Sequence, residues 1–323
     1  MLRSIFRLTV LCGVLIGSAC VMAATFTVTS TADTTDPGTL RWAMQQHFDL
    51  GGDNEIEFDP SLSGATILLS GSLPQVTFNT LTIDGGDAPG LTIDGDGGGR
   101  VFLIANNADG FVLRNLTVEN SDGLFGGGCI NAAGVGDTQI RISNVTFSGC
   151  EERPSGSINA FGGAIFSESN SDGLLDIRGS HFVGNRVYGS SNVIQGGAIY
   201  ASGGTVVLID NTFELNSAEN TGNAFNQGGA VYIRDAEVGM NDNEFLFNQA
   251  QGGSGGAVAL NLTPSNVGNV RRNLFAANQA VTGAAVWTAT QFQNDVPFFN
   301  FWNNTFLANT SSSQPGGALY IRQ

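Results

Sequence analysis

Residues 196–216 read GGAIYASGGTVVLIDNTFELN, and this stretch contains the pattern that decides the fold. Two glycines come first, a short apolar run follows, and Phe-x-x-Asn closes the stretch. The closing motif recurs at intervals of 35, 31, 32, 30 and 31 residues, with Cys in place of Asn at its first occurrence, and begins at Phe147, Phe182, Phe213, Phe245, Phe275 and Phe306. Glycine-led sequences alternate with it and begin at Gly127, Gly162, Gly196, Gly228, Gly255, Gly283 and Gly316. The chain therefore repeats a unit of about 31 residues.

A unit of this length without a helical pattern matches one coil of a solenoid. If coils stack about 4.8 Å apart, equivalent residues lie directly above one another. The positions five and seven residues before each Phe support stacking, because both are mostly apolar and alternate with other positions as core-facing strand residues do. The position five before reads Ile142, Ile177, Leu208, Met240, Val270 and Phe301. We predict an all-β fold, a right-handed parallel β-helix with three short strands per coil.

The apolar alternation breaks between the aliphatic strand and the Phe, which predicts a corner at that point. Asn and Asp tolerate the left-handed backbone conformation that such a corner needs. Two residues before each Phe, the column reads Val145, Ser180, Asn211, Asn243, Asn273 and Asn304. Stacked asparagines can hydrogen-bond along a stack, so we expect an amide ladder here.

Residues 1–24 have the layout of a secretory signal peptide, because two arginines precede an apolar run and small residues follow it. We expect cleavage after Ala23 or Ala24. A lipoprotein signal at Cys20 is the alternative, disfavoured because Gly17 stands where an aliphatic residue is usual. The apolar run is too short for a spanning helix, and no later run reaches that length. The sequence therefore predicts a secreted or outer-surface bacterial protein without a transmembrane segment after cleavage.

One helical pattern follows, over residues 36–48, with Asp36 or Thr39 available as its N-cap. Its apolar stripe has helical spacing and consists of Leu40, Ala43, Met44, His47 and Phe48. We expect this helix to cover the open apolar end of the solenoid. Residues 25–65 are therefore predicted to form an N-terminal cap, and residues 66–323 the β-helix.

The charge of the chain argues against one class of partner. The 323 residues include 28 Asp and Glu, 13 Arg and no Lys, which gives a formal net charge of −15. Residues 1–24 contain two of the Arg and no acid, so the remaining chain carries −17. Such a surface repels phosphate backbones, and nucleic-acid binding is not expected. The chain has two His, neither near a cluster of Cys, so zinc is not expected.

Two cysteines remain once Cys12 and Cys20 leave with the signal. Cys129 occupies the Ala position of a glycine-led strand, and Cys150 occupies the Asn position of the first Phe-x-x-Asn motif. Both positions lie near the same corner of one coil, and exported proteins favour disulfides. We predict a Cys129–Cys150 disulfide; two buried thiols are the alternative.

The alternation of Gly-Gly-Ala-Ile with Phe-x-x-Asn resembles the repeat of polymorphic outer membrane proteins. The N-terminal part also resembles that of secreted bacterial β-helix proteins with a Ser-Leu-Arg-Glu-Ala-like signature, which stands here as Thr39-Leu40-Arg41-Trp42-Ala43. The Ser and the Glu of that signature are replaced. The resemblance implies a right-handed parallel β-helix on a bacterial surface or in the medium, and it implies no single activity. The chain stops half a coil after Gly316, so a truncated C-terminus is expected.

Acidic residues at the corner are weak candidates for a catalytic site. The column three residues before each Phe contains Asp210, Asp242 and Arg272, and the column one before contains His181 and Glu244. Asp210 and Asp242 would lie about 5 Å apart, near the carboxylate spacing of a retaining glycosidase. A lyase would instead use Arg272 or His181 as the base, with Ca²⁺ on the acids. The alternative, which we favour, is ordinary turn chemistry at an Asp corner that is partly neutralised by Arg272.

Calcium is the one cofactor that the sequence leaves open. Asp84, Asp87, Asp94 and Asp96 lie in Gly-rich turns and are weak candidates for its ligands, Asp84 and Asp94 first among them. They lack both the EF-hand spacing and the calcium-binding nonapeptide repeat. Turn formation is the favoured interpretation.

An aromatic column is the candidate binding surface. It follows the Ile or Val of each glycine-led strand and reads Asn131, Phe166, Tyr200, Tyr232, Ala259, Trp287 and Tyr320. If the Ile and Val point into the core, these rings point outward because neighbouring strand residues face opposite sides. We expect an exposed ladder that could stack on sugars or a protein partner. Burial in the core is the alternative.

Three hypotheses for the function follow. The leading one is a secreted or cell-surface protein without enzymatic activity that binds a glycan or a protein along its faces. The second is a polysaccharide lyase or glycoside hydrolase, which would need carboxylates converging in a groove. The third is a passenger fragment of a larger surface protein. The sequence does not indicate an oligomeric state.

Overall fold

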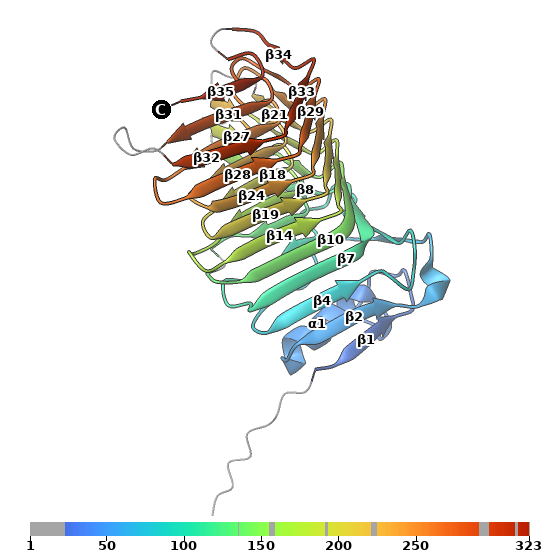
Figure 1. The fold of residues 1–323 in the computed structure, drawn as a ribbon. Helices are drawn as coiled ribbons and strands as arrows, with labels where there is room; N and C mark the ends of the chain where they lie inside the picture. Colours follow the sequence, from blue (N-terminus) through green and yellow to red (C-terminus); the bar gives the residue numbers. More distant parts are fainter. Residues whose placement is uncertain are drawn as a thin grey trace, which may run out of the picture.

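The structure is a computed structural model that describes residues 23–134, 136–154, 159–190, 193–220, 225–290, 297–313 and 316–322. Residues 1–22, which make up almost all of the predicted signal peptide, lie outside this set. Parallel strands stack in successive coils from the N-terminal to the C-terminal end (Figure 1). The parallel β-solenoid predicted from the repeat is therefore confirmed.

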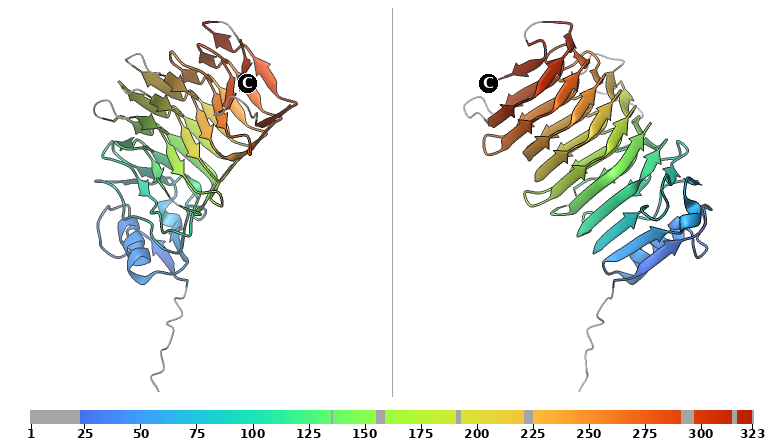
Figure 2. Two further views of the ribbon diagram at one scale, coloured as in Figure 1. Left: turned by 90° about the vertical axis from the view of Figure 1, so that its left-hand side faces the viewer. Right: turned by 45° about the vertical axis from the view of Figure 1, so that its right-hand side comes forward.

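The main sheet contains 17 strands and is formed by the aliphatic and Phe strands of every coil. Its strands are β1 (Thr25–Val28), β2 (Asn54–Phe58), β3 (Thr66–Leu68), β4 (Thr80–Asp84), β5 (Thr92–Asp94), β7 (Gly110–Glu119), β10 (Gln139–Ser148), β14 (Leu174–Arg178), β15 (His181–Val183), β19 (Thr205–Ile209), β20 (Thr212–Glu214), β24 (Glu237–Asn241), β25 (Glu244–Leu246), β28 (Val267–Arg271), β29 (Leu274–Ala276), β32 (Phe298–Trp302) and β33 (Thr305–Leu307). Figure 2 shows this sheet running the length of the molecule.

The glycine-led strands form a second sheet of eight strands. They are β6 (Phe102–Leu103), β9 (Ile130–Ala132), β13 (Ile165–Glu168), β18 (Ile199–Ser202), β23 (Val231–Arg234), β27 (Val258–Leu262), β31 (Val286–Thr290) and β35 (Leu319–Ile321). We call this the glycine-strand sheet. Its ladder keeps equivalent residues in register, for example Tyr200 with Tyr232.

Most coils carry a fourth strand in addition to the three expected from the sequence, just after the Phe-x-x-Asn motif. These strands form a sheet of seven: β8 (Asp122–Gly123), β11 (Glu151–Glu152), β16 (Arg186–Gly189), β21 (Ser217–Asn220), β26 (Gln249–Ala250), β30 (Gln279–Ala280) and β34 (Thr310–Ser311). A further sheet of three strands, which we call the cover sheet, is formed by β12 (Ala160–Phe161), β17 (Val193–Gln195) and β22 (Phe225–Gln227).

The Phe residues of the repeat form one continuous stack in the lumen of the solenoid, which we call the lumen Phe column. Phe182 and Phe213 have ring centroids 4.8 Å apart, as do Phe213 and Phe245. The stack extends to Phe147 at one end and Phe306 at the other. Aliphatic residues from the same coils complete this core. The predicted vertical columns are therefore confirmed.

Buried asparagines join the coils at two corners. At the first corner, Asn211 donates hydrogen bonds to Asn243 Oδ1 from its backbone N–H and from Nδ2, both at 3.0 Å. The second ladder uses the Asn of Phe-x-x-Asn: Asn216 Oδ1 accepts from the backbone N–H and the Nδ2 of Asn185. Each rung thus pairs buried backbone groups that the turns would otherwise leave unpartnered. The amide ladder predicted at the first corner is confirmed.

The corner columns adopt the left-handed conformation expected of them, with φ of 55° at Asp210 and 59° at Asp242. Arg272 occupies the same conformation one coil later, with φ of 55°. Asp and Asn tolerate this conformation better than Arg does, because their short polar side chains bond locally. The corner geometry therefore accounts for most residue types in this column.

The predicted helix is present as α1 (Leu40–Leu50), and a short 3₁₀ helix, η1 (Pro60–Leu62), follows β2. Thr39 caps α1 by accepting a hydrogen bond from the Trp42 N–H. The stripe residues Leu40, Ala43, Met44 and His47 are buried, whereas Phe48 is exposed, contrary to expectation, because it lies near the end of the helix. Helix α1 contacts β1 and β2 at the N-terminal end of the stack (Figure 1). Its role as a cap stays a prediction.

Candidate functional site

The aromatic column lies on the glycine-strand sheet and faces away from the lumen. Its members Phe166, Tyr200, Tyr232 and Trp287 form an apolar cluster that is separate from the lumen core. The Phe166 and Tyr200 rings stack with centroids 5.1 Å apart, and Tyr200 and Tyr232 follow at 5.5 Å. We call this set, with Ala259 and Tyr320, the outer aromatic column.

The expected exposure of this column is wrong. Tyr200 and Tyr232 are each 2% exposed, and Phe166 is 6% exposed. The cause is the cover sheet, which forms from the segments between Phe-x-x-Asn and the next glycines. Phe161 of β12 lies against the column, with its ring centroid 4.6 Å from that of Tyr200. The repeat showed that the rings point outward but did not show what covers them.

The cover sheet ends because its segments become shorter. From the motif's last residue to the next glycine the chain advances 11 residues after Asn185 and 12 after Asn216, but only 7 after Asn248 and 5 after Asn278. The shorter segments reach the cover only as single bridges, Gln227 to Ser254 and Ser254 to Thr282. The cover sheet therefore lies over the middle of the outer aromatic column only; towards the C-terminal end Trp287 is 8% exposed and Tyr320 is half-buried.

A cavity of about 410 Å³ lies at this end of the column. Its lining combines two aromatic residues with hydroxyl, amide and guanidinium groups, and it includes Trp287, Tyr320, Asn226, Gln227, Ser254, Thr282 and Arg322. Asn226 is 1% exposed and its Oδ1 has no hydrogen-bond partner among the described residues. The cavity therefore offers an aromatic surface beside hydroxyl, amide and guanidinium groups. We call it the C-terminal cavity.

The tyrosines of the column are poor acids. Burial raises the pKa of Tyr200 to about 12 and also raises the pKa of Tyr232. The Tyr232 hydroxyl accepts a hydrogen bond of 3.3 Å from Asn261 Nδ2. These hydroxyls stay neutral at physiological pH. The covered part of the column therefore packs under the cover sheet and carries no charge.

The corner acids of the catalytic hypothesis lie together, but they are used as turn residues. Arg272 donates to both oxygens of Asp242, from Nε at 2.6 Å and from a terminal nitrogen at 2.5 Å. This hydrogen bonding lowers the pKa of the Asp242 carboxyl. Asp210 precedes this pair in the same corner column. Asp210, Asp242 and Arg272 are not among the residues that line the C-terminal cavity.

The two remaining members of the catalytic hypothesis occupy the neighbouring column. His181 pairs in register with Thr212, which pairs with Glu244 on the next coil. His181 Nε2 lies 3.6 Å from Glu214, and Glu244 is exposed. The arrangement brings the five residues to one edge of the solenoid without enclosing them.

The candidate calcium ligands are engaged in turns. Asp84 accepts hydrogen bonds from Arg114 Nε at 2.8 Å, from Asn115 Nδ2 at 2.7 Å and from the Gly86 N–H at 2.9 Å. Asp94 accepts from the Asp96 N–H at 2.8 Å. Within the described part of the chain, no group of three or more His, Cys, Asp or Glu is placed to hold a metal ion. These contacts fit the turn interpretation.

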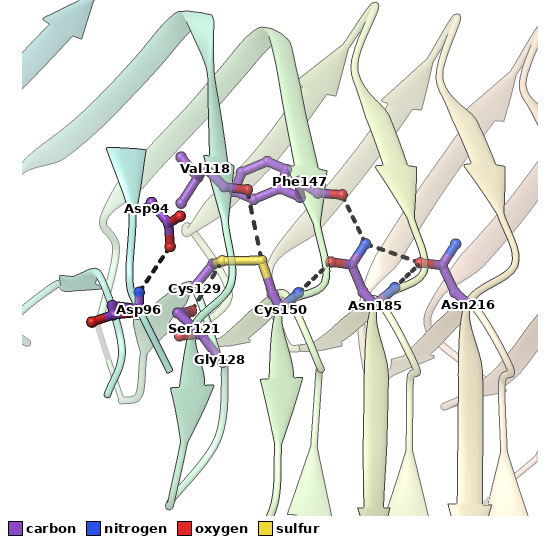
Figure 3. The surroundings of a disulfide bond; sticks show 10 residues. All are labelled: Asp94, Asp96, Val118, Ser121, Gly128, Cys129, Phe147, Cys150, Asn185 and Asn216. Carbon is purple, nitrogen blue, oxygen red and sulfur yellow. Dashed lines mark hydrogen bonds between the residues drawn. A yellow bond between two sulfur atoms is a disulfide. The ribbon is translucent and has the colours of Figure 1, made fainter. Parts of the chain in front are cut away.

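The predicted disulfide between Cys129 and Cys150 is present and fully buried. Figure 3 shows it beside Asn185 and Asn216, at the start of the second asparagine ladder. The Cys150 N–H donates to Asn185 Oδ1 at 3.0 Å, so Cys150 takes the place of the first rung. The disulfide joins the glycine-strand sheet to the main sheet's corner, which fixes the geometry of this coil.

None of the helices in the described part of the chain combines the length and the apolar character needed to cross a membrane. A comparison of the sequence with models of known protein families finds no match, and a search of curated proteins finds no significant relative. The site must therefore be interpreted from its own geometry.

Proposed function

We propose that the protein is exported and binds a glycan in the C-terminal cavity, at the open end of the outer aromatic column. The pattern of residues 1–24 supports export, and the buried Cys129–Cys150 disulfide is typical of exported proteins. The likeness of the repeat to that of polymorphic outer membrane proteins supports a place on a bacterial surface. Binding without catalysis is our preferred form of the proposal.

The observation that carries the proposal is the combination of Trp287 and Tyr320 with polar groups in one cavity. A sugar ring presents a C–H face that packs on an aromatic ring, and it presents hydroxyls around its edge. Ligand sites typically combine an apolar surface with a few polar groups that fix orientation. The cavity's volume of about 410 Å³ lies in the usual range for such sites.

The solenoid supports binding on its outside only. Its lumen is filled by the lumen Phe column and aliphatic residues, all packed in one core. The corner acids are a weaker basis for an enzyme, because the Asp242 carboxylate is held by Arg272 at an exposed turn. An outer cavity lined by rings and amides suits recognition better than it suits proton transfer.

The test is a panel of neutral and acidic oligosaccharides measured against the purified protein by intrinsic fluorescence and calorimetry. The chain has three Trp, and Trp287→Ala should abolish binding while Trp302→Ala leaves it unchanged. Trp302 is the control because it lies on the main sheet and does not line the cavity. Thermal melts of both variants establish that they are folded.

Assays of the same panel for unsaturated products and new reducing ends address the hydrolase and lyase hypotheses. Product formation that Asp210→Asn abolishes would overturn binding without catalysis. Binding that survives Trp287→Ala would overturn the placement of the site. If no glycan on the panel binds, the proposal fails and a protein partner becomes the better hypothesis.

A further inference from the structure

A second cavity, of about 360 Å³, lies at the opposite end of the same outer column. We call it the N-terminal cavity. Leu103 lines it, and Leu103 pairs in register with Asn131, which pairs with Phe166. The other lining residues are Ser72, Leu73, Gly98, Gly99, Arg100, Asp122, Leu124 and Phe125. The two cavities therefore mark the two ends of one column, and the cover sheet lies between them.

Arg100 supplies the cavity with a cation that no carboxylate holds. No ion pair or hydrogen bond of its side chain is found among the described residues, whereas Arg114, Arg153 and Arg186 are all paired. Arg100 is half-buried, and burial lowers its pKa, with the negative charge of Glu152 acting in the opposite direction. A partly desolvated guanidinium without a partner favours an incoming anion, and its planar fork suits a carboxylate or phosphate.

Glu152 is the nearby counter-charge, and the Gly126 amide is the one hydrogen-bonding group of the described residues that favours its ionised form. Glu152 is fully buried, and neither of its oxygens accepts a hydrogen bond of ordinary geometry from the described residues. It also lies beyond ion-pair distance of Arg100, since no pair within 4.0 Å is formed. A buried carboxyl with so few partners favours its neutral form.

The position of Glu152 explains how this carboxyl is accommodated. Glu152 pairs in register with Gly123 on one side and Val187 on the other. Gly123 leaves the space that the carboxyl fills, because a Cβ added there would lie 2.6 Å from Glu152 Oε2. Later coils place Ala218 and Ala250 in this column. An acid thus occupies a position that elsewhere holds a small apolar residue.

Asp122 also lines the cavity. Its Oδ2 accepts from Arg153 at 2.8 Å, and its Oδ1 is buried and has no partner among the described residues. A ligand that matches both Arg100 and Asp122 carries an anionic group and hydroxyl donors. A phosphate ion offers fewer hydrogen-bond donors than a sugar acid and carries more negative charge. Asp122 and the net charge of −17 that the chain carries outside residues 1–24 would repel it. The exposed Phe125 ring and Leu124 add an apolar surface for a sugar face.

We propose that the N-terminal cavity binds a sugar acid, with its carboxylate on Arg100 and its hydroxyls towards Asp122, and that Glu152 competes with the ligand for the charge of Arg100. The inference concerns a different cavity from the proposed glycan site and does not depend on Trp287. When Glu152 is protonated, Arg100 is free to hold the ligand. When Glu152 ionises, its charge offsets that of Arg100 and opposes a second carboxylate.

The direction of the pH dependence follows from the groups that face Glu152. Burial raises the pKa of Glu152 to about 7, with the Gly126 amide and Arg100 acting to lower it and Asp122 acting to raise it. The neighbour on β16 is the uncharged Val187. Affinity for a sugar acid should therefore fall as the pH rises through this value.

The experiment measures D-galacturonate binding to the full protein by calorimetry, at about pH 6 and about pH 8, where Glu152 changes its charge. We expect binding at the lower pH and an affinity roughly tenfold weaker at the higher pH. Arg100→Gln should weaken binding by at least about tenfold, as for loss of a charge-assisted hydrogen bond, and Arg100→Lys by less. Glu152→Gln should bind equally at both pH values.

Controls separate this site from others. Arg141→Gln is the matched variant, because Arg141 is exposed and bonds only to Gln139 among the described residues; it should bind as the unaltered protein does. D-Galactose should not bind in this cavity, and inorganic phosphate should not displace galacturonate. Trp287→Ala should leave galacturonate binding unchanged. Failure of galacturonate to bind near pH 6, equal binding by Arg100→Gln, or preference for phosphate would each overturn the proposal.

Discussion

The lumen Phe column and the outer aromatic column run in parallel through the same coils, yet they differ in composition. The lumen column repeats Phe at every step, with ring centroids between 4.8 and 5.1 Å apart. The outer column changes from Phe166 to tyrosines, to Ala259, and then to Trp287. Uniform residues mark a column that only has to pack, whereas varied residues mark one whose rungs meet different surroundings.

The difference has a physical origin. Each lumen rung from Phe182 to Phe275 meets an identical rung above and below, so one shape fits these positions. Each outer rung meets a cover of a different extent, which is a three-stranded sheet around Tyr200 and is reduced to single bridges towards Trp287. The outer column can therefore open into a cavity without disturbing the core, and function can be placed there at little cost in stability.

The largest effect is expected for Phe213→Ala in the lumen. Phe213 is fully buried between two stacked rings. Its loss should cost about 3–5 kcal/mol of the free energy of unfolding, measured by urea denaturation. Tyr232→Phe in the outer column keeps the ring and removes the hydroxyl, which accepts a hydrogen bond from Asn261, and should cost about 1 kcal/mol. Equal losses would contradict the distinction between the two columns.

Removal of a ladder amide should rank next. Asn216→Ala removes the acceptor of the Asn185 N–H and Nδ2 and the donor to the Phe182 carbonyl, all of which are buried. We expect a loss of roughly 3 kcal/mol because buried backbone groups lose their partners. Asn309 is the half-buried rung at the C-terminal end of the same ladder. Asn309→Ala should cost clearly less by the same denaturation assay. A small loss at Asn216 would show that water replaces the amide.

Glu152 should make the free energy of unfolding depend on pH. The folded pKa of Glu152 is raised to about 7 from an ordinary 4.5. Ionisation therefore opposes folding as the pH rises from about 4.5 to about 7, and the unaltered protein should lose up to about 3 kcal/mol of stability across that range relative to Glu152→Gln. Below the ordinary value the two proteins should respond to pH alike. The measurement is the difference in free energy of unfolding at several pH values; a constant difference would contradict a buried, titrating Glu152.

The corner pair should have the smallest effect. Arg272 is exposed and Asp242 is partly exposed at the edge of the solenoid, where solvent and salt screen their attraction. Asp242→Asn keeps a residue that tolerates the left-handed turn, so its melting temperature should match that of the unaltered protein. A large decrease would show that the corner pair supports the stack after all.

The sequence predicts the stack well because its columns repeat. Phe213 and Asn211 recur at a fixed interval, and their roles follow from alternation and from the needs of a corner. The disulfide was predictable for a related reason, since Cys129 and Cys150 replace residues of known position in the repeat.

The cavities could not be predicted in this way, because they depend on what interrupts the repeat. Asn226 lies in β22 of the cover sheet. Among the described residues only three coils contribute a strand to this sheet, so Asn226 is not part of the repeat. Glu152 carries a signal that alignment of the fourth strand would have found, namely an acid in a column with Val187 and Ala218. That strand follows the conspicuous motif and is short, so the repeat did not reveal it. The exposure of Tyr200 depended on Phe161, which lies outside the repeated pattern.

The most direct test of the central claim is a crystal structure of the protein with an oligosaccharide that binds in solution. We predict a sugar ring packed on Trp287 beside Tyr320, with the lumen Phe column unchanged. A sugar bound instead at the corner of Asp210 and Asp242, or on the exposed Trp302, would contradict the assignment of the outer aromatic column as the binding face.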